Sequence, residues 1–367
     1  MTRAGPMLLP GSEHLEQTAC FDLMLAGFAR AEQRALPLIE RRYRFGQHVV
    51  LLRFAGPALF DALGRALAHL VDTGDSPAAF TIDLWDSEST GEALSPLIQF
   101  MRSRIAYNHY EFLSPRHEIL GISNERVPAT LDQWSGAFSL YDREQRHGVY
   151  WVESADDVPY FERAAPLRTM LSWGLAELGM QSVHAAGVGT PDGGVLLAGR
   201  GGSGKSSTAL RCLEAGMGYL ADDYCLISDS PPAEAFSMYS VAKLNGVADL
   251  QRMPSFLPHI VNPDAAGDEK LVMYLADSFA DQLLTSFPVR AVLVPRVTGG
   301  SDTVLEPISS AAALRALGPT TLLQRPGAGP EAMRAMSSFV SSVPCFELQL
   351  GSNSDEIPRV IKDLLGQ

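Results

Sequence analysis

The stretch LLAGRGGSGKSSTALRCLEAG, residues 196–216, decides the fold of the second half of this chain. Its middle fits G-x-x-x-x-G-K-[ST] from Gly199 to Ser206, after an apolar run and before residues with helical spacing. A strand that enters a glycine-rich loop and leaves it as a helix is the setting in which this motif binds phosphate groups. We therefore predict a strand over 194–199 and a helix over 206–216.

Each residue type in the motif has a physical task. Glycines let backbone N–H groups turn inward and approach phosphate oxygens, because no Cβ stands in the way. Lys205 would contact the β- and γ-phosphates of a nucleotide, the hydroxyl of Ser206 would ligate Mg²⁺, and the helix would add its positive N-terminal end. The predicted nucleotide-binding residues are Gly199, Gly201, Gly202, Ser203, Gly204, Lys205, Ser206 and Ser207.

A pair of aspartates, Asp222 and Asp223, follows within YLADDYCLI (219–227), which we predict to be the next strand. Phosphoryl transfer needs one carboxylate that helps to hold Mg²⁺ and another that orients the nucleophile and accepts its proton. The alternative for such a pair is a solvated acidic turn. Its position on the strand after the loop favours the functional interpretation.

The class of nucleotide-dependent protein is narrowed by what the sequence lacks. It has no LSGGQ signature, no long apolar run that ends in Asp-Glu and no NKxD base-reading motif. These absences favour a kinase by elimination. A small-molecule kinase or carboxykinase-like enzyme and a non-catalytic nucleotide sensor remain alternatives.

The segment VHAAGVG…GGVLLAGRGGSGKSSTALRCLEAGMGYLADDYCLI resembles the catalytic domain of HPr kinase/phosphorylase over residues 182–228, about an eighth of the chain. That family consists of bacterial P-loop kinases that phosphorylate a serine of a small carrier protein, and its fold is related to phosphoenolpyruvate carboxykinase. His184 precedes Lys205 by 21 positions (205−184), and Asp222 follows Lys205 by 17 (222−205). Both separations agree with the family pattern.

The resemblance implies a role for each of these residues, with ATP and Mg²⁺ as cofactors. Lys205 would bind the phosphates, and Ser206 and Asp222 would hold the metal. Asp223 would accept the proton of the substrate serine, and His184 would lie near the transferred phosphate. From the residues alone, a single histidine on an apolar strand is more typical of a hydrogen-bonded core residue, so a catalytic His184 depends on the resemblance.

The sequence also departs from the family. Ala185-Ala186-Gly187 follow His184 where the family has a glycine, and no LExRGLG-type motif occurs after residue 228. We therefore do not expect reversal by inorganic phosphate. The pattern is closer to stand-alone HPr-kinase-like proteins, some of which phosphorylate a serine of a precursor peptide such as that of a lasso peptide. The resemblance thus implies a peptide or small-protein substrate.

Two domains are expected. Residues 1–160 are predicted to form an α+β domain that recognises substrate or packs between subunits, and 161–367 an α/β P-loop kinase domain. The boundary is placed in ESADDVPYFERAAP (153–166), which is polar and acidic and contains two prolines. We also expect a homo-oligomer.

In the first domain we predict a helix over 14–40, with residues 1–13 loose. The predicted strands are HVVLLRF (48–54), AFTIDLWD (79–86), GAFSLYD (136–142) and GVYWVES (148–154).

Composition excludes several classes of protein. The net charge is −13 and the sequence pI about 5.1, which argues against binding to nucleic acid or to anionic membranes. No apolar run approaches the ~20 residues of a membrane span, and the N-terminus does not read as a signal peptide. The four scattered cysteines form no CxxC pair and suit a reducing compartment with buried thiols. We expect a soluble cytoplasmic protein.

Four further cations are candidates for the site. Lys243 in SVAKLNG is predicted with equal weight to meet a phosphate or acidic substrate or to be an ordinary surface lysine. Arg290, Arg296 and Arg325 could each supply charge that stabilises transfer. The segment RPGAGPE (325–331) is predicted to be a plain loop, with a mobile lid as the alternative.

Overall fold

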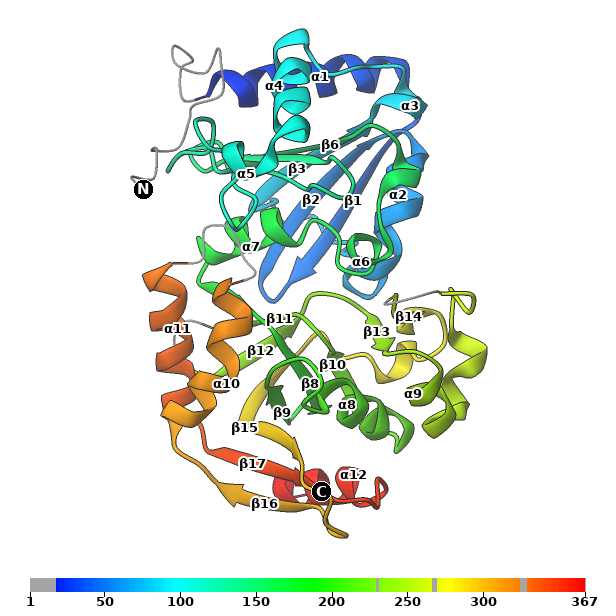
Figure 1. Ribbon diagram of the computed structural model, residues 1–367, viewed down its shortest axis with the longest axis vertical. Helices are drawn as coiled ribbons and strands as arrows, with labels where there is room; N and C mark the ends of the chain where they lie inside the picture. Colours follow the sequence, from blue (N-terminus) through cyan, green and yellow to red (C-terminus); the bar gives the residue numbers. More distant parts are fainter. Residues whose placement is uncertain (1–17, 229–230, 266–268, 324–328, 367) are drawn as a thin grey trace. The chain divides into compact units, whose positions relative to one another are not determined.

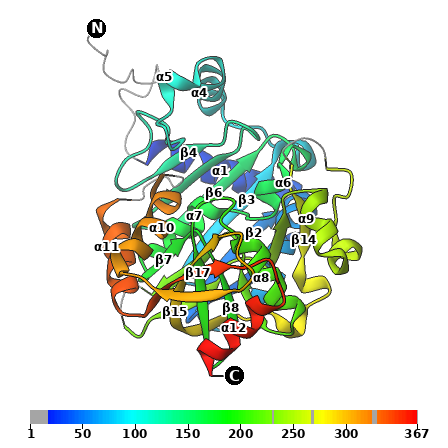
Figure 2. The same cartoon turned by 60° about the horizontal axis from the view of Figure 1, so that its bottom comes forward.

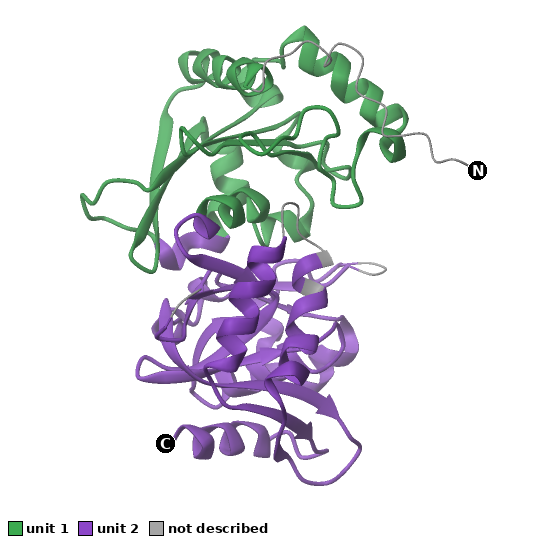
Figure 3. Cartoon of the chain, turned by 90° about the vertical axis from the view of Figure 1, so that its left-hand side faces the viewer, with its two compact units in different colours: residues 1–65, 71–174, 325–327 green, residues 66–70, 175–324, 328–367 purple. Residues whose placement is uncertain are grey.

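The structure is a computed structural model that describes residues 18–228, 231–265, 269–323 and 329–366 (Figure 1, Figure 2). The predictions for residues 1–13, for Arg325 and for most of the 325–331 loop lie outside this part of the chain. The chain divides into two compact units (Figure 3): unit 1 comprises residues 1–65, 71–174 and 325–327, and unit 2 comprises 66–70, 175–324 and 328–367. The division after residue 174 falls within α7 (Arg168–Ala176).

Unit 1 contains, in its described residues, a mixed six-stranded sheet. β2, β3 and β6 run parallel to one another, and the remaining neighbours pair antiparallel. In sheet order the strands are β1 (Leu38–Phe45), β2 (His48–Ala55), β3 (Phe80–Asp86), β6 (His147–Val152), β5 (Phe138–Asp142) and β4 (Ala129–Leu131).

Helices cover both faces of this sheet. On one face α1, α4 and α5 pack around Trp85 and Trp151, which are both fully buried. On the other face α2 stacks Phe60 edge-on against Phe54, and the backbone of α7 at Gly174 lies against the ring of Phe80. The helices are α1 (Ala19–Arg34), α2 (Pro57–Leu63), α3 (Ser87–Thr90), α4 (Pro96–Tyr107), α5 (His109–Phe112) and α6 (Tyr160–Arg163), together with α7.

The predicted strands of unit 1 are confirmed as β2, β3, β5 and β6, but the predicted helix over 14–40 is too long. It ends at Arg34, and β1 begins at Leu38. Pro37 explains the break, because proline lacks the N–H that a helix interior needs.

Unit 2 contains a larger mixed sheet, of nine strands in the described residues. Its main path runs β10 (Gly218–Ala221), β8 (Ala185–Thr190), β9 (Gly193–Ala198), β15 (Ser286–Val297), β12 (Glu234–Ser237), β11 (Cys225–Ser228) and β7 (Met180–Val183). β17 (Cys345–Leu350) runs parallel to β15 and pairs with β16 (Val304–Pro307). The protein is thus a mixed α/β chain with several sheets, as expected at this coarse level.

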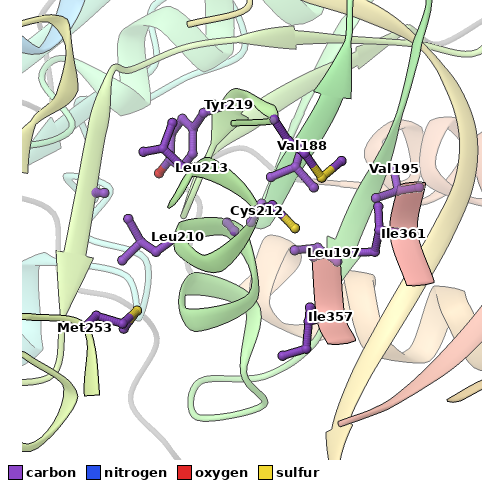
Figure 4. Close-up of a cluster of buried hydrophobic side chains, with 14 of the residues drawn as sticks. Val188, Val195, Leu197, Leu210, Cys212, Leu213, Tyr219, Met253, Ile357 and Ile361 are labelled. Atoms are coloured by element: carbon purple, nitrogen blue, oxygen red, sulfur yellow. The ribbon is translucent and has the colours of Figure 1, made fainter. Parts of the chain in front are cut away.

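The two faces of β9 explain why its sequence is apolar throughout. Val195 and Leu197 pack with α8 (Lys205–Glu214) and α12 (Glu356–Leu365), as Figure 4 shows. Leu196 and Ala198 point the other way, toward α10 (Ser310–Leu323) and α11 (Pro330–Ser341). Because alternate residues of a strand face opposite sides, a strand covered by helices on both faces reads as a continuous apolar run.

The segment YLADDYCLI forms two strands instead of the single predicted one. β10 ends at Ala221 and pairs with β8, whereas β11 begins at Cys225 and pairs with β7 and β12. Asp222 and Asp223 therefore lie in the break between two strands that have different partners. Further along the chain, β13 (Val241–Leu244) and β14 (Leu271–Tyr274) pair antiparallel, and the short helix α9 (Val247–Arg252) lies between them in sequence.

All four cysteines are described, and they are free and buried, as predicted. Within the described ranges, no helix combines the length and apolar character needed to cross a membrane.

Candidate active site

The glycine-rich loop, residues 199–204, connects β9 to α8 and is held at both ends by the core shown in Figure 4. Leu197 anchors the strand, and Leu210 and Leu213 anchor the helix. Two of its glycines are required by space. A Cβ on Gly199 would lie 2.6 Å from Ser203 Oγ, and one on Gly204, whose φ is +103°, would lie 2.6 Å from Leu350 Cδ1. The core thus presents a compact loop that other residue types would distort.

Several backbone N–H groups of this loop have no acceptor in the described part of the protein. Among the described residues, the backbone N–H groups of 201, 202 and 204–206 donate to no protein acceptor, while Ser203 N donates to Arg200 O at 3.2 Å. Ser203 Oγ is buried and has no partner there either. Free N–H groups at the start of a ten-residue helix form a site for an anion, because they add to the positive end of the helix dipole.

The side chain of Lys205 is hydrogen-bonded to the backbone of the loop itself. Its side-chain ammonium Nζ donates to Gly199 O at 2.7 Å and to Arg200 O at 3.3 Å, and the residue is 5% exposed. Burial lowers the pKa of Lys205, while the charges of Asp222 and Asp223 oppose that shift. The lysine therefore stands close enough to both carboxylates for their charges to act on it.

Asp222 is a buried carboxylate that lacks part of its hydrogen bonding. It is 3% exposed, and Oδ2 accepts one bond, from the backbone N–H of Lys243 at 3.1 Å. Oδ1 has no hydrogen-bond partner within the described residues, although the Ser206 hydroxyl is near enough to favour the ionised form. Burial, and next the charge of Asp223, raise the pKa of Asp222 above its usual range. A cation at Oδ1 would reverse that balance.

The oxygen atoms at Asp222 and Ser206 fit a Mg²⁺ ion that is held partly by the protein and partly by a bound phosphate. Oδ1 of Asp222 and the hydroxyl of Ser206 are hard oxygen donors, the type that Mg²⁺ prefers. The described part of the chain offers no group of three or more His, Cys, Asp or Glu that could enclose a metal. Mg²⁺ would therefore bind here through one or two protein oxygens, with phosphate oxygens and waters completing its shell, as is common for this ion.

Asp223 is surrounded by positive charge. Lys243 Nζ lies 3.0 Å from Oδ2 and His184 Nε2 lies 3.8 Å from Oδ1. Burial alone would raise the pKa of Asp223, but the charges of Lys243, Lys270 and His184 outweigh it and hold the pKa well below its usual range. Asp223 is consequently ionised and accepts hydrogen bonds, which suits a group that orients a hydroxyl.

His184 occupies the break between β7 and β8. Its backbone N–H donates to Thr321 Oγ1 at 3.0 Å, and its ring stands edge-on to Tyr224 with centroids 5.3 Å apart. These contacts hold the imidazole beside Asp223. The structure therefore brings together the predicted catalytic group of Lys205, Asp223 and His184 with the predicted metal ligands Ser206 and Asp222.

Sequence reasoning missed part of the cation set. Lys243 proves to be a partner of the acid pair, with a side chain that is 10% exposed, and Lys270, whose charge acts on both Asp223 and Lys205, was not singled out. One signal could have found them. The chain has 25 arginines but four lysines, at 205, 243, 270 and 362, and three of the four act on the acid pair. A compact ammonium is therefore used here where the chain otherwise uses guanidinium.

The two described candidate arginines lie elsewhere. Arg290 Nη2 donates to the carbonyl of Asp192 at 2.8 Å, and Arg296 Nη1 pairs with Glu347 at 3.2 Å. Both side chains are exposed, and neither contacts the loop or the acid pair among the described residues. Each is satisfied locally, so the prediction that they stabilise transfer finds no support in their positions.

Comparisons with known proteins add little to this geometry. No protein family model and no curated protein matches the chain. Among solved structures, the chain is similar to the HPr(Ser) kinase/phosphatase from Coxiella burnetii, with 12% sequence identity over 51% of this chain and 94% of that chain. The TM-score is 0.29. A likeness of this size carries no argument about fold or activity, so the interpretation of the site rests on its own residues.

Proposed function

We propose that unit 2 is a kinase domain that binds ATP with Mg²⁺ and transfers the γ-phosphoryl group to a hydroxyl. One observation carries this proposal: the unsatisfied N–H groups and Lys205 of the glycine-rich loop stand beside a buried carboxylate oxygen, Asp222 Oδ1, that has no partner in the described residues. Asp222 Oδ1 is buried, and buried polar groups are normally paired. Donors without acceptors beside an acceptor without a donor are complementary to a phosphate chain with its cation.

Each residue of the site has a part in the proposed transfer. The loop N–H groups and Lys205 would bind the phosphate oxygens and stabilise the charge that develops on them. Ser206 and Asp222 would hold Mg²⁺, which when bound would neutralise charge on the phosphates. Asp223 would accept a hydrogen bond from the acceptor hydroxyl and so direct its oxygen toward the γ-phosphorus. The bond from that oxygen to phosphorus forms, the bond from phosphorus to ADP breaks, and the proton passes to Asp223.

The molecule that accepts the phosphoryl group is the next part of the proposal. The resemblance of residues 182–228 to HPr kinase/phosphorylase favours a serine of a peptide or small protein, and a small-molecule hydroxyl is the alternative. Unit 1 would recognise that acceptor or serve assembly. It contains a cavity of about 860 Å³ whose lining includes the exposed side chains of Tyr110 and Trp134, which makes it a place to look for peptide recognition.

The test compares wild-type protein with Lys205→Ala. Binding of Mg·ATP is measured at equilibrium, and transfer from [γ-³²P]ATP is screened against serine-containing peptides and against small hydroxyl compounds. Lys205→Ala is expected to abolish transfer, because the developing charge loses its main side-chain cation. Lys362→Ala removes the same charge from a partly exposed side chain that donates to Ala215 O, and it should leave transfer intact.

The possible outcomes separate the candidate functions. Labelled peptide supports the serine kinase, and a labelled small molecule supports the alternative kinase. Binding of Mg·ATP without transfer to any acceptor would identify a nucleotide sensor. Full transfer activity in Lys205→Ala would contradict the assignment of the loop.

A further inference from the structure

Lys243 touches both aspartates of the site through different parts of the same residue. Its backbone N–H donates to Asp222 Oδ2 at 3.1 Å, and its side-chain ammonium donates to Asp223 Oδ2 at 3.0 Å. The side chains of Lys243 and Asp223 are 10% and 18% exposed, so water competes weakly for this pair.

The backbone at this point is fixed independently of the lysine side chain. Lys243 lies on β13 and pairs with Val272 of β14. Its neighbours Ala242 and Leu244 are buried in the same core that holds α8. A substitution at position 243 should therefore leave the strand, and with it the N–H bond to Asp222, in place.

We propose that Lys243 is the positioning residue of the acceptor half of the site, with its side chain fixing the Asp223 carboxylate while its backbone fixes Asp222 for the nucleotide half. This inference rests on the proposed kinase function. It assigns the two hydrogen bonds of one residue to two separable steps: the N–H bond supports binding of Mg·ATP, and the ammonium supports the orientation of the hydroxyl that attacks. Orientation of a reacting group is worth several orders of magnitude in rate when it is lost completely.

The other two lysines supply the contrast that the test needs. Lys205 contacts the carbonyls of the loop, so it belongs to the phosphate side. Lys270 acts on Asp223 by charge, and no hydrogen bond or ion pair between the two is recorded among the described residues. Neutralising Lys270 thus removes a positive charge near Asp223 without breaking a hydrogen bond to it. Neutralising Lys243 removes a positive charge and breaks the hydrogen bond to Asp223.

The experiment compares Lys243→Met, Lys243→Gln, Lys243→Arg and Lys270→Met with the wild-type full chain. For each protein we would measure the dissociation constant of Mg·ATP at equilibrium and the rate of [³²P]phosphate release from Mg·[γ-³²P]ATP with water as the acceptor. Thermal unfolding shows whether each variant folds. If Lys243→Met does not fold, Lys243→Gln, which also removes the charge but keeps a hydrogen-bond donor, takes its place.

The expected result is a split between binding and turnover. Lys243→Met should bind Mg·ATP within about threefold of wild type and lose turnover by roughly 10- to 100-fold. Lys243→Arg should recover part of that loss, because guanidinium can donate to the carboxylate and keeps the charge. Lys270→Met should lose less than about tenfold in turnover, because it breaks no hydrogen bond.

Three results would overturn the inference. One is a loss of Mg·ATP affinity in Lys243→Met as large as that in Lys205→Ala, since Lys243 would then bind the nucleotide. Another is turnover equal to wild type. A third is an equal loss of turnover in Lys243→Met and Lys270→Met, which would show that charge alone matters and that the hydrogen bond from Lys243 does not. Failure of wild-type protein to bind Mg·ATP would overturn the proposed function and this inference together, so the two failures are distinguishable.

Discussion

Unit 1 and unit 2 each bury an aspartate, and the two are treated in opposite ways. Asp142 of unit 1 is fully buried and uses both of its oxygens. Arg126 Nη2 lies 3.0 Å from Oδ2, the N–H groups of Glu144 and Gln145 donate to Oδ1, and the Gln145 side chain donates to Oδ2. Burial would raise its pKa, but these bonds and the charge of Arg126 lower it below the usual range.

Asp222 of unit 2 is almost as deeply buried, but its Oδ1 has no hydrogen-bond partner within the described residues, and its pKa is raised. A buried carboxylate that is not paired costs free energy, so a fold that needs it only for stability satisfies it, as at Asp142. The difference teaches that burial by itself does not mark a functional acid. The mark is burial combined with missing partners and with unsatisfied donors nearby.

Among the aspartates, the largest effect on turnover should come from Asp223. Asp223→Asn is expected to keep Mg·ATP binding and lose turnover by roughly 10²–10⁴, the usual worth of a positioned base. Equilibrium binding and the transfer assay in parallel measure the two quantities. Asp83→Asn is the matched control and should leave turnover unchanged, because the buried Asp83 carboxylate of unit 1 pairs with Arg53 at 3.2 Å and lies 2.9 Å from His147 Nε2. Full turnover in Asp223→Asn would show that the acid pair is not catalytic.

The two aspartates of the comparison can be exchanged for asparagine one at a time. Asp142→Asn should destabilise unit 1 by about 3 kcal/mol, because it breaks a buried ion pair and leaves donors unpaired. Asp222→Asn should change the free energy of unfolding by less than about 1 kcal/mol, because few bonds are lost, and should weaken Mg²⁺-dependent ATP binding. Denaturant unfolding and binding titrations with and without Mg²⁺ report these effects. Equal destabilisation by both changes would break the comparison.

A buried histidine tests whether missing partners alone mark a site. His69 belongs to unit 2, its Nε2 lies 2.7 Å from Ser237 Oγ, and its Nδ1 has no partner among the described residues. Burial lowers the pKa of His69 to about 4 from an ordinary value near 6.5. The unfolded chain therefore binds the proton first, so stability is complete above pH 6.5 and is lost as the pH falls toward 4.

At pH 5 that loss should be about 2 kcal/mol, and His69→Gln should flatten the dependence on pH between 6.5 and 5. Unfolding at a series of pH values measures it. The same variant should bind Mg·ATP as wild type does, because no unsatisfied donors or acid partner accompany His69 in the described structure. Loss of nucleotide binding in His69→Gln would show that the comparison drawn from Asp142 and Asp222 is too simple.

Much of the local structure follows from local pattern. The strands at 48–55, 80–86 and 193–198 were predictable as short, largely apolar runs, and the helix from 205 to 214 by the helical spacing of its apolar residues. The break at Asp222 was not, since YLADDYCLI reads as one apolar strand that is interrupted only by the two aspartates. β10 pairs with β8 and β11 with β7 and β12, and such pairing partners are distant in sequence. The glycine-rich loop was predictable because all the residues of its motif lie within eight consecutive positions.

The sequence by itself determined the glycine-rich loop, its flanking strand and helix, and the presence of a histidine and two aspartates at defined distances from Lys205. These depend on residue type and spacing, which act over a few turns of chain. Only the tertiary structure decided that Lys243 bridges the two aspartates, that Asp222 Oδ1 lacks a partner in the described chain, and that Arg290 and Arg296 lie elsewhere. The reason is physical: hydrogen-bond balance and burial are properties of groups brought together from separate strands, and no single stretch of the chain contains them.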